Sequence, residues 1–163
     1  MSKVREYHNE AIRLAQMAMA ASQRNEHTES QQLARRAMEY ETQAADLIPE
    51  GKSSEPTRSI LYRSAASFAY QAGEYQEAER LIFKGLAGYP NVRVKQQLLE
   101  VQALIQEAQQ NPDLAKEDRR ALIQSVITAT YENGVLHPSV ALPLQEHQTV
   151  EIQILPDFAS APA

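Results

Sequence analysis

The sequence contains no cysteine and no tryptophan, and only five of its 163 residues are glycine. Without cysteine there can be no disulfide framework and no thiolate chemistry, which is typical of a protein that works in a reducing compartment. No apolar run approaches the length that spans a bilayer, and the N-terminus lacks the uninterrupted apolar core of a signal peptide. We therefore predict a cytoplasmic protein that does not enter the membrane.

The usual sequence patterns of enzymes are also missing. There is no glycine-rich phosphate loop, nucleophile elbow or dinucleotide fingerprint. The histidines do not have the spacing of metal ligands, so we expect surface or turn roles for all four. They are His8, His27, His137 and His147. The sequence thus predicts no catalytic, cofactor-binding or metal-ligating residues, no cofactor, and a protein that is not an enzyme.

Basic residues are missing from the C-terminal quarter. Residues 121–163 hold no lysine or arginine and carry a charge of −4, whereas residues 1–120 hold sixteen basic and seventeen acidic side chains, which leaves −1. A surface that binds nucleic acid must neutralise phosphates with lysine or arginine. Nucleic acid is therefore not an expected partner of the tail.

Residues 59–90 predict two amphipathic helices joined by a tight turn at Gly73, and the remaining chain can be described as additions to this hairpin. A glycine there can adopt the left-handed conformation that ends a helix, so the chain can reverse. Small residues such as Gly85 would let the helices approach closely. Two apolar stripes have helical spacing. They are Leu61, Ala65, Phe68 and Ala72, and then Tyr75, Ala78, Ile82, Leu86 and Tyr89.

Three more helices are predicted around this hairpin. Residues 3–23 and a helix that ends at Pro49 form a first hairpin, which repeats the small-residue and proline spacing of the second. The polar residues 50–57 join the two hairpins as a loop. A fifth helix, capped by Asn91, is expected to cover the open face of the second hairpin. Its apolar stripe is Val94, Leu98, Val101, Ile105 and Ala108.

Residues 59–90 resemble a tetratricopeptide repeat, a helical hairpin of thirty-four residues that stacks into arrays. The positions that match are Tyr62, Ala65, Ala66, Gly73, Tyr75, Ala78, Gly85 and Pro90. The sequence departs from the family at Ala65, where leucine is usual, and at Ala69, where tyrosine is preferred. The resemblance implies a protein that binds a protein or peptide partner on its helices.

One side of the first helix of this repeat carries the polar residues that we predict to bind the partner. These are Arg63, Ser67, Tyr70 and Gln71. They share the side that repeat proteins turn toward a concave groove, and the arginine could hold a peptide carboxylate in bidentate fashion. The alternative is that this side packs on the second helix and that Arg63 extends to water.

The hydrophobic period changes to two after residue 125. Residues 126–131 alternate as a strand, and Asn133 with Gly134 is the strongest short signal for a β-hairpin turn. Residues 150–154 alternate as a third strand. A unit of three short strands is too small to bury enough apolar surface by itself.

Residues 125–156 resemble the small β family of VapB-type antitoxins from type II toxin–antitoxin systems. The positions that carry the resemblance are Ala129, Tyr131, Glu132, Asn133, Gly134, Val135, Leu136, Pro138, Leu142, Leu144 and the strand 150–154. The chain departs at His147, where the family tends to have glycine. The resemblance implies a compact dimeric β unit that embraces its twin or a toxin.

The unpaired strand edges also favour association, because they can pair with another chain. We predict that the β unit makes a homodimer; the alternative is that its strands dock on the helices. The expected interface residues are Tyr131, Val135, Leu136, Val150, Ile152 and Ile154.

Together these patterns predict an α+β protein that is mainly α. Its parts are a helical domain (1–110), a linker or short helix (111–124), an antitoxin-like β unit (125–156) and a tail (157–163). The expected function is a non-enzymatic protein–protein interaction module that dimerises through its β unit. The alternative is an antitoxin-like regulator whose β unit binds and inhibits a toxin nuclease.

Overall fold

The structure is a computed structural model that describes residues 2–111 and 129–138. Within these ranges the chain forms five α-helices, one short 3₁₀-helix and a two-stranded antiparallel sheet, which confirms the predicted mainly helical α+β class. The helices are α1 (Lys3–Gln23), α2 (His27–Asp46), η1 (Lys52–Ser54), α3 (Thr57–Ala72), α4 (Tyr75–Ala87) and α5 (Val92–Gln110). The strands are β1 (Ala129–Glu132) and β2 (Val135–Pro138).

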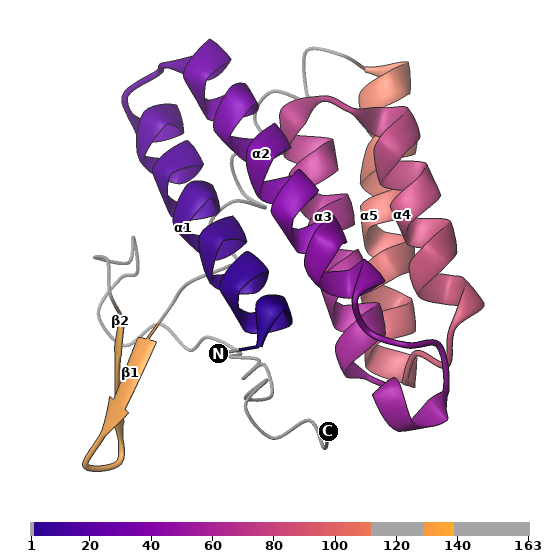
Figure 1. Cartoon of the computed structure of the whole chain (residues 1–163). Helices are drawn as coiled ribbons and strands as arrows, with labels where there is room; N and C mark the ends of the chain where they lie inside the picture. The colour runs from indigo at the N-terminus through magenta and orange to yellow at the C-terminus, as the bar shows by residue number, and fades with distance from the viewer. Residues whose placement is uncertain (1, 112–128, 139–163) are drawn as a thin grey trace.

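The helices α1 to α4 lie side by side in chain order, each packed on the next, and α5 packs on α4 (Figure 1). The helix α3 also contacts α5, so that α2, α4 and α5 all pack against it. Nearly every residue of α3 is buried as a result. Two stacked hairpins followed by a fifth helix are the arrangement that the apolar stripes predicted. No helix in the described part of the chain is both long and apolar enough to cross a bilayer.

Two helix ends are fixed by residues that the sequence marks as caps. Gly73 has a φ of 79° and ends α3 in the left-handed conformation, which confirms the predicted turn. The side chain of Asn91 accepts a hydrogen bond of 2.9 Å from the backbone N–H of Val94, as expected of an N-cap. The helix α2 ends at Asp46, earlier than predicted. A residue that precedes proline avoids the helical conformation, so Ile48, which precedes Pro49, cannot continue the helix.

The core is built from alanines and a few large side chains, and the helices are correspondingly close. A Cβ atom added to Gly85 of α4 would lie 3.0 Å from Cδ1 of Leu98 on α5 and 3.3 Å from Cβ of Tyr62 on α3. Glycine at this position lets three helices meet. The stripe predicted for α5 is buried throughout, so this helix does cover the second hairpin.

The hairpin of β1 and β2 is drawn outside the stack of helices in Figure 1. Asn133 and Gly134 have φ angles of 52° and 86°, and this confirms the predicted turn. All four residues of β1 and three of the four in β2 are exposed. The third strand predicted at 150–154 lies outside the described residues.

Candidate functional site

The four residues predicted to bind a partner all lie on α3, but that side of the helix is not an open groove. Ser67, Tyr70 and Gln71 are buried and Arg63 is half-buried. The physical reason is the central position of α3, which has neighbours on three sides. The partner-binding role of these residues stays a prediction.

Polar atoms nevertheless remain unsatisfied along this row. Nε of Arg63 and both amide atoms of Gln71 are buried and make no hydrogen bond within residues 2–111 and 129–138. Between them, the hydroxyl of Ser67 donates a 3.0 Å bond to the backbone carbonyl of Arg63. Buried polar groups are usually hydrogen-bonded, so two unsatisfied side chains in one row call for an explanation.

A buried polar cluster joins α1, α2 and α3. Its centre is Glu41 of α2, whose side chain is 0% exposed. The Nδ1 atom of His8 lies 2.9 Å from Oε2 of Glu41 and 3.1 Å from Oε1. The charge of Arg63 and the hydroxyl of Ser64, both on α3, also act on this carboxylate. We call His8, Glu41, Arg63 and Ser64 the inner polar cluster.

Burial shifts the pKa values of two members of this cluster. Removal from water raises the pKa of Glu41, and the hydrogen bond and charge of His8 oppose that change. Burial also lowers the pKa of Arg63, and the nearby charge of Glu41 opposes it. A fully buried carboxylate cannot contact a substrate from solvent, so we assign the cluster to joining three helices.

The inner polar cluster contradicts the prediction made for His8 and contains a residue, Glu41, that the sequence did not lead us to expect. His8 is buried and paired, so the expected surface or turn role is wrong for this histidine. Glu41 was not singled out by the sequence reasoning. The sequence nevertheless contained a sign of its role: Glu41 follows Ala37 by four residues and therefore places a charge on the apolar stripe of α2.

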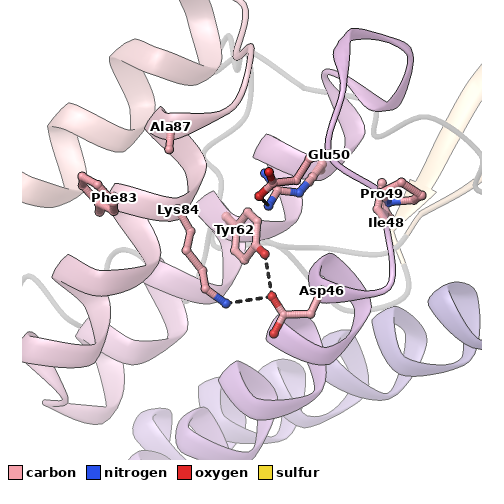
Figure 2. A pocket seen from close by; sticks show the side chains of 9 residues that line it. Asp46, Ile48, Pro49, Glu50, Tyr62, Phe83, Lys84 and Ala87 are labelled. Carbon is pink, nitrogen blue, oxygen red and sulfur yellow. Dashed lines mark hydrogen bonds and ion pairs between the residues drawn. The ribbon is translucent and has the colours of Figure 1, made fainter.

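A pocket of about 500 Å³ opens between the C-terminal end of α2, the loop that follows it, and α4 (Figure 2). We call it the α2–α4 pocket. Figure 2 shows Tyr62 of α3 between Phe83 on one side and Ile48 with Pro49 on the other. The lining residues are Asp46, Ile48, Pro49, Glu50, Arg58, Tyr62, Phe83, Lys84 and Ala87.

The ring of Tyr62 is surrounded by charges. Its hydroxyl donates a 2.5 Å hydrogen bond to Oδ1 of Asp46, and the same oxygen is 2.8 Å from Nζ of Lys84 (Figure 2). The guanidinium carbon of Arg58 lies 4.9 Å from the ring centroid and Nζ of Lys84 lies 5.3 Å from it. Both cations are thus at the distance of a cation–π interaction.

These contacts change two pKa values. Burial and the hydrogen bond to Asp46 raise the pKa of Tyr62 to about 12. Partial burial alone would raise the pKa of Asp46, but hydrogen bonds from Lys84 and Tyr62 outweigh it and the pKa is lowered. Asp46 therefore forms an ion pair with Lys84 and also accepts a hydrogen bond from Tyr62.

The second ion pair of the pocket is asymmetric. Nη2 of Arg58 lies 2.8 Å from Oε1 of Glu50, but the Arg58 side chain is 8% exposed and that of Glu50 is 85% exposed. The buried Nε of Arg58 makes no hydrogen bond with any described residue. Sequence reasoning missed this site because its charges come from elements far apart in the chain.

The hairpin carries three of the six predicted interface residues. Tyr131 is 70% exposed and Val135 is 54% exposed, while Leu136 is half-buried. The other three, Val150, Ile152 and Ile154, lie outside the described residues.

A family model described as AF2212-like matches residues 123–160. No curated protein and no solved structure matches the chain. The matched segment contains the hairpin and the whole region 125–156 whose residues resemble the small β antitoxins, and the helical array lies outside it.

Proposed function

We propose that this protein is a non-enzymatic interaction module in which the helical array binds a protein or peptide partner and the β unit joins two copies of the chain. The observation that supports it best is the exposure of the hairpin. A two-stranded hairpin is marginally stable by itself, and here Tyr131 and Val135 are open to solvent. Pairing with a second copy would satisfy a strand edge, and packing of the two copies would cover the face that carries Tyr131.

The AF2212-like match supports treating the C-terminal segment as a unit of its own. The family model matches residues 123–160 and none of the five helices, and a unit with its own boundaries can carry its own interface.

Light scattering on the intact chain and on a variant that lacks residues 125–163 tests the dimer. We expect twice the mass of one chain for the intact protein and a single-chain mass for the deletion. A single-chain mass for both proteins contradicts the proposal.

The second candidate is an antitoxin-like regulator, favoured by the resemblance of residues 125–156 to VapB-type antitoxins. In this role the same exposed strands would bind and inhibit a toxin nuclease. If a reading frame beside this gene encodes a small nuclease, co-expression of the two proteins followed by co-purification tests it. Retention of the nuclease by the intact chain and its loss on removal of residues 125–163 are expected.

Within the array, two places could receive a partner: the α3 row of Arg63, Ser67, Tyr70 and Gln71, and the α2–α4 pocket. The row has unsatisfied polar atoms, but only Arg63 reaches solvent and its other three residues are buried. The pocket is open and combines charge with exposed apolar surface.

A further inference from the structure

The two carboxylates of the α2–α4 pocket are held very differently. Asp46 is bound by both Lys84 and the hydroxyl of Tyr62, so it is fixed in place. Glu50 contacts Arg58 from a loop position, with a side chain that is almost entirely in water. An ion pair with such an exposed member contributes little to stability, so Glu50 can be displaced easily.

Arg58 is only half satisfied by Glu50. The hydrogen bond goes to Nη2, and the buried Nε has no partner among the described residues. Nε–H and Nη2–H lie on the same edge of a guanidinium group and can bind the two oxygens of one carboxylate in parallel. A carboxylate that is not restrained by the 50–57 loop could therefore make one more hydrogen bond than Glu50 does.

The rest of the pocket favours an acidic ligand with an apolar neighbour. When Glu50 turns to water, the pocket retains Arg58, Lys84 and Asp46 and has a charge of +1, whereas the whole chain carries −5. Beside these charges stands Phe83, which is 73% exposed and offers an aromatic face. Exposed aromatic surface next to a desolvated arginine is typical of the centre of an interface.

We propose that the α2–α4 pocket binds an acidic side chain of a partner peptide through Arg58, with an adjacent apolar side chain against Phe83. Glu50 occupies the position of the acid until the partner replaces it. This inference rests on the proposed interaction function, but it involves neither the β unit nor the α3 row.

Nuclear magnetic resonance of the intact, ¹⁵N-labelled chain tests the pocket with two pools of pentapeptides blocked at both ends. One pool has glutamate between two leucines or phenylalanines, and the other has glutamine in its place. We expect the glutamate pool to shift the amide signals of Arg58, Phe83 and Lys84, and the glutamine pool to bind about tenfold more weakly because a charged hydrogen-bonded pair is lost.

Variants of the intact chain separate the roles of the pocket residues. Glu50→Gln removes the internal competitor and is expected to tighten binding about two- to fivefold, the worth of an exposed ion pair. Glu107→Gln removes the same charge from an exposed position on α5 and is the matched control, with unchanged affinity. Phe83→Ser is expected to weaken binding about tenfold through the lost apolar contact.

Arg58→Gln is expected to abolish binding, and if this variant does not fold, Glu50→Gln and Phe83→Ser decide the question. Equal binding of the two pools, no binding of either, or the same effect from Glu50→Gln and Glu107→Gln overturns the inference. Shifts confined to Ser67 and Gln71 overturn it too, although they support a partner site on the helices. Because the dimer is measured separately by light scattering, its failure and the failure of the pocket are distinguishable.

Discussion

The helical array and the hairpin are built from similar residues but use them in opposite ways. Val94 of α5 is 0% exposed in the array, whereas Val135 of β2 is 54% exposed. In the array each helix has at least one packed neighbour, and α3 is covered by three. The hairpin pairs only its two strands with each other among the described residues. The array can therefore account for its own stability, and the hairpin needs another surface.

The largest expected effect is on the array. Glu41→Ala leaves the buried His8 and the half-buried Arg63 without their acid, and removal of one member of a buried pair costs about 3 kcal/mol of unfolding free energy. Chemical denaturation measures it. Glu39→Ala, an exposed position on the same helix, is the control and is expected to change stability by less than about 0.5 kcal/mol.

Glu41→Gln sharpens this experiment. The amide keeps an oxygen for the Nδ1–H of His8 and avoids the burial of a charge, so most of the stability should remain. Equal stability of Glu41→Ala and Glu39→Ala would show that the inner polar cluster does not join the helices.

The next largest effect on the unfolding free energy is expected from a substitution of Tyr62. Tyr62→Phe removes the hydrogen bond to Asp46 and is expected to cost about 1.5 kcal/mol at neutral pH. The folded pKa of about 12 is above the ordinary value of about 10 for tyrosine. The protonated phenol therefore stabilises the fold fully below about pH 10, and this contribution is lost as the pH rises to about 12.

Denaturation at several alkaline pH values should consequently show the difference between the native chain and Tyr62→Phe shrinking between about pH 10 and pH 12. The same substitution in the hairpin, Tyr131→Phe, is the matched control, because this ring is exposed and should not change the unfolding of the helices. A constant difference across the alkaline range argues against the proposed bond between Tyr62 and Asp46.

The smallest effect on the stability of the helical array is expected from a substitution in the hairpin. Val135→Ser should leave the unfolding free energy of the helices within about 0.5 kcal/mol, since the side chain is exposed. It should instead weaken dimerisation, which sedimentation at several concentrations measures. A large loss of helical stability would mean that the strands dock on the array, the alternative that the sequence left open.

The sequence predicted the elements better than the sites. Periodicity and turn residues located all five helices, the turn at Gly73 and the hairpin turn at Asn133 and Gly134, because these features depend on a few neighbouring residues. Burial around α3 depends on three other helices, so the polar spacing of Ser67 and Gln71 could not reveal that they are enclosed. The α2–α4 pocket was missed for the same reason, since Asp46 and Lys84 meet only after the hairpins stack.

The position of Glu41 has a consequence for how the chain opens. In stacked repeats each hairpin can unravel separately, starting from an end, because it interacts only with its neighbours. Glu41 pairs with His8 within the first hairpin and faces Arg63 of the second, so separation of the two hairpins would cost Glu41 and Arg63 their mutual attraction, and this penalises that route. Amide hydrogens in α1 and α3 should then exchange with deuterium together, as one unit rather than as two successive ones.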